Sequence, residues 1–111
     1  MAIKNEIGIG LLGLGVVGSK IAGHLLQNLE ELSLNLNEPM VLRRVLVRNM
    51  QLPRSISLPE GILTDDFSVV LNDPNIHIVV EVMGGETPAV DYLIQLLKNG
   101  KSVVTANKEV M

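Results

Sequence analysis

The chain has no cysteine and no tryptophan, and it contains only one tyrosine and one phenylalanine. Without cysteine it can form neither disulfides nor thiolate metal sites, so its redox compartment is left open. Its histidines, His24 and His77, have no metal-ligand spacing; we expect surface or packing roles for them and predict no metal site. With 47% hydrophobic residues and few aromatic ones, the core must be aliphatic, as is typical of strands buried on both faces of a parallel sheet.

A basic face and a membrane-length apolar run are also missing. The formal net charge of −3 argues against a nucleic-acid partner, because nucleic acids bind basic surfaces. The apolar run at residues 7–18 is too short to cross a membrane, contains five glycines and leads to no small-residue cleavage site. We therefore expect a cytoplasmic protein without a membrane partner, with residues 1–111 forming one domain.

Strand-like and helix-like segments alternate along the chain. Strands are expected at residues 6–12, 41–47, 62–63, 76–83 and 102–105. A first helix should follow Gly18, and a short helix capped by Thr64 or Asp65 should run to about Leu71. A last helix should begin near Pro88 and end at Asn99-Gly100. Its inward-facing stripe should consist of Val90, Leu93, Ile94 and Leu97. This alternation predicts an α/β fold, a Rossmann-type doubly wound parallel sheet with strand order 3-2-1-4-5.

Two overlapping G-x-G-x-x-G motifs occur near the N-terminus. Gly8 and Gly10 open the first motif inside the expected strand, where they would relieve crowding against the first helix. The second motif lies where that strand ends and the helix begins, so backbone N–H groups there can meet a pyrophosphate. In it Gly13 makes the tight turn, Gly15 lets phosphates approach and Gly18 allows close packing of helix and strand. A glycine turn can also serve packing alone, but the strand–turn–helix context favours a dinucleotide site.

The second strand ends in Arg48 rather than in an acid, and residues 40–53 contain no Asp or Glu. An acid at this point would hold the ribose hydroxyls of NAD, whereas a guanidinium suits the 2′-phosphate of NADP. The sequence therefore favours NADP as the cofactor, with NAD as the alternative. For Arg43 and Arg44 we expect solvated charges at the start of the strand.

Small and polar residues follow the fourth and fifth strands. The pair Gly84-Gly85 would either let the cofactor backbone pass closely or form a plain turn. Glu81 lies in an apolar strand, where an unpaired carboxylate is costly, so it is a partnered structural group or a substrate-side residue; we favour the structural role. After the fifth strand, Thr105, Asn107 and Lys108 offer a hydroxyl, an amide and an ammonium at the edge where open α/β sheets bind ligands.

Four segments of the chain resemble the amino-terminal part of homoserine dehydrogenases. They are Gly13-Leu14-Gly15-Val16-Val17-Gly18, Val45-Leu46-Val47-Arg48, Val79-Val80-Glu81-Val82-Met83-Gly84-Gly85 and Val103-Val104-Thr105-Ala106-Asn107-Lys108. The resemblance covers nearly the whole chain from Ile7 onward, and the last segment is the most specific. It implies an oxidoreductase that interconverts L-homoserine and L-aspartate 4-semialdehyde with NAD(P), in threonine, methionine and isoleucine synthesis.

The resemblance also implies roles for single residues. The pyrophosphate would lie on residues 15–18, the adenosine 2′-phosphate near Arg48 and the nicotinamide ribose near Thr105. Lys108 matches a family lysine beside the cofactor and the reacting carbon, where a cation would stabilise alkoxide character. Asn49 departs from the Asp of many relatives, which leaves Arg48 more available to a phosphate. The full cofactor-binding set implied is Gly13, Leu14, Gly15, Val16, Val17, Gly18, Arg48, Gly84, Gly85, Thr105, Ala106, Asn107 and Lys108.

The relatives are longer than this chain. They continue into a dimerisation and substrate domain that residues 1–111 lack, so the resemblance implies a small-molecule substrate and a homo-oligomer for the complete enzyme. For this chain, as a truncated form or natural fragment, we expect cofactor binding without turnover. An alternative of another class is a stand-alone dinucleotide-sensing module, which would need no cation at the position of Lys108. Another small-substrate dehydrogenase with this fold would carry different residues after the fifth strand.

Overall fold

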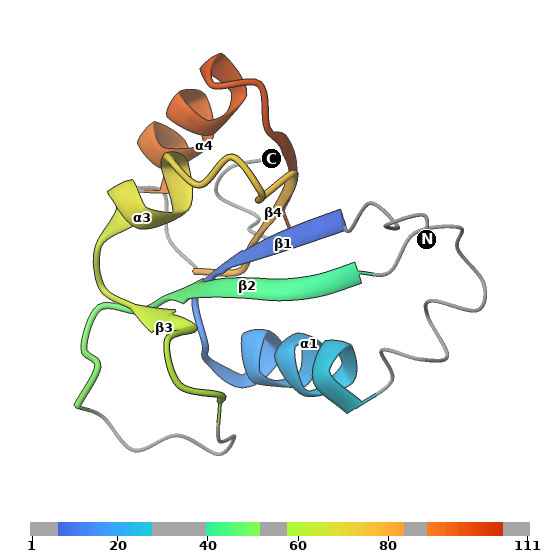
Figure 1. Cartoon of the computed structure of the whole chain (residues 1–111). Coiled ribbons are helices and arrows are strands. Elements are labelled where there is room, and N and C mark those ends of the chain that lie inside the picture. The colour runs from blue at the N-terminus through green and yellow to red at the C-terminus, as the bar shows by residue number, and fades with distance from the viewer. Residues whose placement is uncertain (1–6, 28–39, 52–57, 84–88, 106–111) are drawn as a thin grey trace, which may run out of the picture.

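A computed structural model of the protein describes residues 7–27, 40–51, 58–83 and 89–105 (Figure 1). The strands are β1 (Ile7–Leu12), β2 (Met40–Leu46), β3 (Leu63–Thr64), β4 (Ile78–Glu81) and β5 (Ser102–Thr105). The helices are α1 (Val16–Gln27), α3 (Phe67–Leu71) and α4 (Ala89–Lys98). All neighbouring strands are parallel, in the order β3-β2-β1-β4-β5. The predicted Rossmann-type sheet and its strand order are confirmed.

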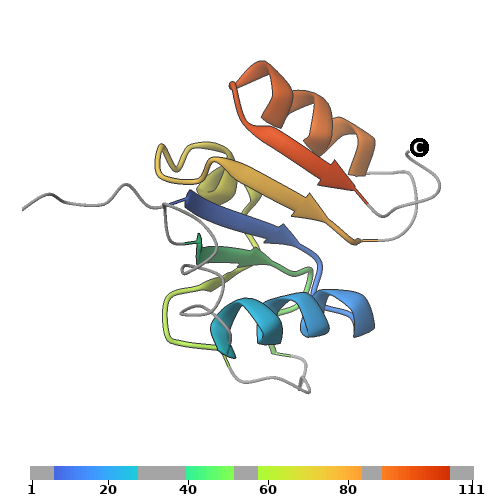
Figure 2. The same ribbon diagram turned by 90° about the vertical axis from the view of Figure 1, so that its right-hand side faces the viewer.

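Helices cover both faces of the sheet, α1 on one face and α3 with α4 on the other (Figures 1 and 2). Successive residues of β1 point to opposite faces of the sheet, because side chains alternate along a strand. Ile9 and Leu11 pack in a cluster with Ala22 of α1, whereas Leu12 packs in the cluster under α3 and α4. With both faces covered, the strands read as nearly continuous apolar runs, which is why the sequence predicted a buried parallel sheet.

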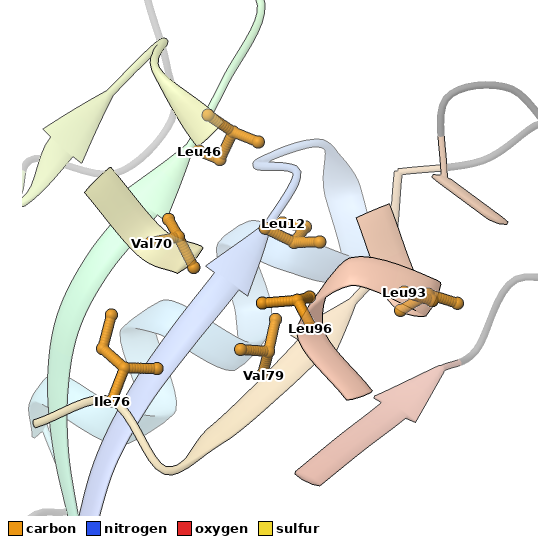
Figure 3. Packing of buried hydrophobic residues seen from close by; sticks show 7 residues of the cluster. All are labelled: Leu12, Leu46, Val70, Ile76, Val79, Leu93 and Leu96. Atoms are coloured by element: carbon orange, nitrogen blue, oxygen red, sulfur yellow. The ribbon is translucent and has the colours of Figure 1, made fainter. Parts of the chain in front are cut away.

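The second cluster joins the sheet to α3 and α4 (Figure 3). Its buried members are Leu12, Leu46, Val70, Ile76, Val79, Leu93 and Leu96. Next to it the rings of Phe67 and Tyr92 stack with centroids 3.8 Å apart, which ties α3 to α4. This cluster is aliphatic apart from that pair at its margin, as the composition predicts.

Several helix and strand ends differ from the sequence prediction. Helix α1 already begins at Val16, two residues before Gly18. The cap of α3 is Asp66, not Thr64 or Asp65: its carboxylate accepts from the backbone N–H of Ser68 at 2.9 Å. The Thr64 hydroxyl instead accepts from the Asp66 N–H at 3.1 Å, and Thr64 belongs to β3. Strand β4 is shorter than expected, four residues rather than eight.

The end of α4 agrees with the sequence prediction, but the predicted inward stripe is correct for Leu93 and wrong for Ile94 and Leu97. Gly100 closes the helix with a φ of +82°, and β5 follows at the predicted residues. Of the predicted stripe, Ile94 and Leu97 are 46% and 59% exposed. The buried residues of the helix are Ala89, Leu93 and Leu96. Both stripes have helical spacing, and the small side chain of Ala89 lets this side of the helix lie against the sheet.

Gly8 and Gly10 do not relieve crowding against the first helix, as had been expected. A Cβ on Gly8 would lie 1.7 Å from the carbonyl oxygen of Asn75. A Cβ on Gly10 would lie 3.2 Å from Val70 and 3.3 Å from Ile76. These contacts lie on the face of the sheet that α3 covers. The lack of a side chain at Gly8 leaves room for the turn before β4, and its lack at Gly10 leaves room for Val70 of α3 and for Ile76.

Candidate functional site

Glycines shape the turn between β1 and α1 at the carboxyl edge of the sheet. Gly13 has a φ of +102°, and its N–H donates to the carbonyl of Leu46 at the end of β2 (2.9 Å). A Cβ on Gly13 would lie 3.0 Å from the Val82 carbonyl, and one on Gly18 would lie 2.4 Å from the Gly13 carbonyl. Gly13 thus makes the tight turn and Gly18 lets the helix approach it, as expected from their positions in the motif.

Gly15 differs from these two because it faces open space. It is exposed, and among the described residues a Cβ built on it would meet no atom within 4 Å beyond its own chain neighbours. Its carbonyl accepts the first helical hydrogen bond, from the Ser19 N–H at 2.8 Å. The N–H groups of Val16, Val17 and Gly18 therefore have no acceptor within the helix, and the helix dipole adds positive potential. An uncovered glycine at a helix N-terminus fits the pyrophosphate of a dinucleotide.

Arg48 lies at the same edge, two residues beyond the end of β2, and is exposed. The hydrogen bond from Gly13 to Leu46 joins the two segments, so the arginine and the glycine turn share one end of the sheet. Next to it, the side chain of Asn49 accepts from the N–H of Gln51 at 2.9 Å and stabilises a turn. A guanidinium at this position can meet an anionic group bound at the carboxyl edge.

Arg43 and Arg44 are not solvated charges at the start of the strand. Both lie within β2 and are half-buried. Arg43 Nε donates to the Asp73 carboxylate at 3.1 Å, and Arg44 Nη1 donates to the carbonyl of Gly61 at 2.8 Å. The register shift between β1 and β2 leaves Arg43 without a pairing position. Of these three arginines, Arg48 alone lies beyond the carboxyl end of β2.

The end of β4 carries the fully buried Glu81, which is 0% exposed. Its Oε2 accepts from the N–H of Met83 at 2.7 Å, and its Oε1 accepts from the Thr105 hydroxyl at 2.6 Å. Glu81 and Thr105 are direct register partners at the ends of β4 and β5. Glu81 is therefore a partnered carboxylate, as the sequence analysis favoured. The sequence did not identify Thr105 as a partner of Glu81, because the predicted fourth strand extended to residue 83 and did not end at Glu81.

The remaining predicted residues fall in two groups. Gly84, Gly85, Ala106, Asn107 and Lys108 lie outside the described residues, as do the side chains of Val16 and His24. His77 lies near the amino end of the sheet, where its Nδ1 accepts from the N–H of Gly8 at 2.9 Å. This packing role was expected.

The described residues contain neither a metal-binding cluster nor a membrane-spanning helix. Over residues 7–27, 40–51, 58–83 and 89–105, no group of three or more His, Asp or Glu could hold a metal ion. Within the same part of the chain, no helix has the length and apolar character needed to span a bilayer.

Comparison with known proteins agrees with this geometry. Residues 13–111 match the family model described as homoserine dehydrogenase, NAD binding domain, which names a nicotinamide dinucleotide as the cofactor class. The homoserine dehydrogenases of Bacillus subtilis and Synechocystis are 37% and 43% identical over 95% and 93% of the chain. The chain spans only 24% and 23% of their lengths.

A crystal structure of Staphylococcus aureus homoserine dehydrogenase at pH 7.5 superposes with a TM-score of 0.87 at 41% identity. The superposition covers 94% of this chain and 27% of that one. The residues that match the family model include the glycine turn and β5, which belong to two of the four segments that carry the sequence resemblance. The chain belongs to the homoserine dehydrogenase NAD-binding domain family.

Proposed function

We propose that this chain is the cofactor-binding part of an NADP-dependent homoserine dehydrogenase that interconverts L-homoserine and L-aspartate 4-semialdehyde. The observation that carries the proposal is the open side of Gly15 at the start of α1, with exposed Arg48 at the same edge. An acid-free strand end with an arginine favours a 2′-phosphate over a free ribose hydroxyl.

In this proposal the cofactor lies along the carboxyl edge of the sheet. The turn with Gly13, Leu14 and Gly15 and the first N–H groups of α1 hold the pyrophosphate, and Arg48 holds the 2′-phosphate. The nicotinamide half lies toward Thr105, and the residues at 84–85 and 106–108, which follow β4 and β5 in the sequence, resemble the family signature. When bound, the dinucleotide supplies or accepts the hydride.

Lys108 is the proposed catalytic residue. A cation beside the reacting carbon would stabilise alkoxide character as the carbonyl is reduced or the alcohol is oxidised. In a protein that carries this sequence together with a substrate domain, Lys108→Ala should lower kcat far more than cofactor affinity. Unchanged turnover would contradict the electrostatic role of Lys108.

The cofactor preference tests the function directly. Isothermal titration of the chain should show tighter binding of NADPH than of NADH. Arg48→Ala should weaken NADPH binding by about tenfold, the loss of one charge-assisted hydrogen bond, and leave NADH binding nearly unchanged. Lys98→Ala is the matched control, since Lys98 is an exposed cation in the last turn of α4. Equal affinities, or tighter NADH binding by the wild type, would contradict the assignment of Arg48.

The wider setting follows from the same proposal. The complete protein would act in the cytoplasm on a small-molecule substrate, as a homo-oligomer, in threonine and methionine biosynthesis. Nucleic acid is no partner, because the chain carries a net charge of −3.

A further inference from the structure

Glu81 is a buried acid that the proposed function does not yet use. It is 0% exposed at the carboxyl end of β4, between β1 and β5. Burying a carboxylate costs free energy unless it is hydrogen-bonded, and a hydrophobic residue would fill this position at lower cost. Its place at the ligand edge of the sheet suggests a use beyond packing.

The hydrogen bonds of Glu81 fix the direction of the Thr105 hydroxyl. The Met83 N–H can only donate, so the oxygen that it meets, Oε2, must be an acceptor. The other oxygen, Oε1, accepts the hydroxyl proton of Thr105 at 2.6 Å. A hydroxyl has one proton and two lone pairs. Toward any other group, Thr105 therefore presents lone pairs.

This hydroxyl lies beside the proposed cofactor site. Leu12, Glu81 and Thr105 are register partners across β1, β4 and β5, so they form one row across the carboxyl end of the sheet. The row lies immediately before Gly13, where the glycine turn begins. Figure 2 shows these three strands side by side with their arrowheads at the same end. Thr105 is half-buried, whereas Glu81 on the neighbouring strand has no exposed surface.

We propose that Glu81 is a positioning residue that holds the Thr105 hydroxyl as a hydrogen-bond acceptor for a donor group on the nicotinamide–ribose half of the cofactor. The inference rests on the proposed function, because it assumes that a nicotinamide dinucleotide lies along this edge. Glu81 acts through Thr105 and does not itself touch the cofactor.

Substitutions of nearly equal size separate this role from packing. In Glu81→Gln the single amide oxygen must face the Met83 N–H, so the amide NH₂ faces Thr105. The hydroxyl must then accept from the amide, and its own proton turns outward, which reverses its polarity toward the cofactor. Thr105→Val removes the hydroxyl, and Thr105→Ser restores it.

The experiment compares two ligands by isothermal titration with the full chain. One is the dinucleotide that the wild type binds more tightly, NADPH or NADH. The other is its counterpart without nicotinamide, 2′-phospho-ADP-ribose or ADP-ribose. Glu81→Gln and Thr105→Val should each weaken dinucleotide binding by about threefold to tenfold, the effect of one hydrogen bond, and change the counterpart by less than about twofold. Thr105→Ser should bind like the wild type.

A double variant gives the sharpest test. Because Glu81 acts through Thr105, adding Glu81→Gln to Thr105→Val should weaken dinucleotide binding no further. Equal losses for both ligands, or additive losses in the double variant, would overturn the proposal in favour of a packing role. Unchanged dinucleotide binding by Thr105→Val would also overturn it, even if Glu81→Gln failed to fold. A wild-type chain that bound neither ligand would instead refute the proposed function.

Discussion

At the scale of single residues, the glycines of the β1–α1 turn differ in what a side chain would meet. Gly18 is closed, since a Cβ there would lie 2.4 Å from a backbone oxygen of Gly13. At Gly15, by contrast, an added Cβ would have no atom of the described part of the chain within 4 Å, apart from its sequence neighbours. The same motif thus contains a glycine required by the fold and a glycine that only a ligand would require.

Alanine substitutions should separate these two requirements. Gly18→Ala should lower the free energy of unfolding by about 1–3 kcal/mol, because backbone must move to admit the methyl group. Gly15→Ala should leave that free energy nearly unchanged and weaken dinucleotide binding, because the methyl group would occupy the side that a pyrophosphate approaches. Urea denaturation and isothermal titration measure the two quantities. Unchanged dinucleotide affinity in Gly15→Ala would contradict the proposed site.

Asp73 holds a hydrogen-bond network together near the amino end of the sheet. Burial by itself raises the pKa of Asp73, but hydrogen bonds from the Asn75 N–H and the Arg43 guanidinium, with the charges of Arg43 and Arg44, outweigh it. The pKa is therefore held below its usual value of 3.8. The Lys101 ammonium also donates to the Asp73 carbonyl at 2.7 Å, so the side chain and the backbone of this residue both join the network.

This lowered pKa predicts part of the acid sensitivity of the fold. An aspartate with a lower pKa in the folded state stabilises the protein above its unfolded value of 3.8, and this contribution is lost as the pH falls through the folded value. Asp73→Asn should therefore lose less stability than the wild type between about pH 7 and about pH 3. Urea denaturation at both pH values tests this. The same loss in both proteins would rule out a contribution from Asp73.

At the scale of elements, the strands were easier to predict than the helix faces. Strand β5 was predicted with its observed bounds, because both faces of a parallel strand are apolar and Asn99-Gly100 marks its start. The rotation of α4 was not predicted, since apolar residues surround much of this helix. Contact with the sheet selects Leu93 and Leu96 and leaves Leu97 exposed, and only the packed structure contains that contact.

Two neighbouring leucines of α4 should therefore differ strongly in how much stability is lost when each is replaced by alanine. Leu96 is fully buried, so Leu96→Ala should lower the free energy of unfolding by about 2–5 kcal/mol. Leu97 is 59% exposed, and Leu97→Ala should change it by no more than about 0.5 kcal/mol. Urea denaturation of the two variants compares the same chemical change at adjacent positions. Similar losses would contradict the observed face of α4, and a larger loss for Leu97→Ala would favour the stripe predicted from the sequence.

At the scale of the whole molecule, β5 is an edge of the described sheet and pairs with β4 on one side. Val104 on this strand is 56% exposed. Unpaired backbone groups along an edge strand can pair with another chain, and an apolar side chain beside them favours such contact. We expect this edge to make the chain self-associate at high concentration.

A charge on the edge should prevent that association. Val104→Lys should shift the sedimentation profile of a concentrated sample toward the monomer, since lysine on an edge strand opposes pairing. Ile94→Lys is the matched control, because Ile94 is 46% exposed on α4 and not on a strand edge. A wild-type chain that stayed monomeric at high concentration would refute the prediction.

The sequence by itself determined the Rossmann-type sheet, its strand order and the family, because these depend on local patterns. Apolar runs mark buried strands and glycines mark turns. A short contiguous signature such as Val103 to Lys108 can be recognised in the sequence without knowledge of the fold. Tertiary structure alone decided the face of α4, the partners of Arg43 and the pairing of Glu81 with Thr105. Each of these joins residues distant in sequence, and strand register and packing bring them together. The glycine turn was therefore recognised from the chain alone, whereas the acid that orients Thr105 emerged only when β4 and β5 were paired.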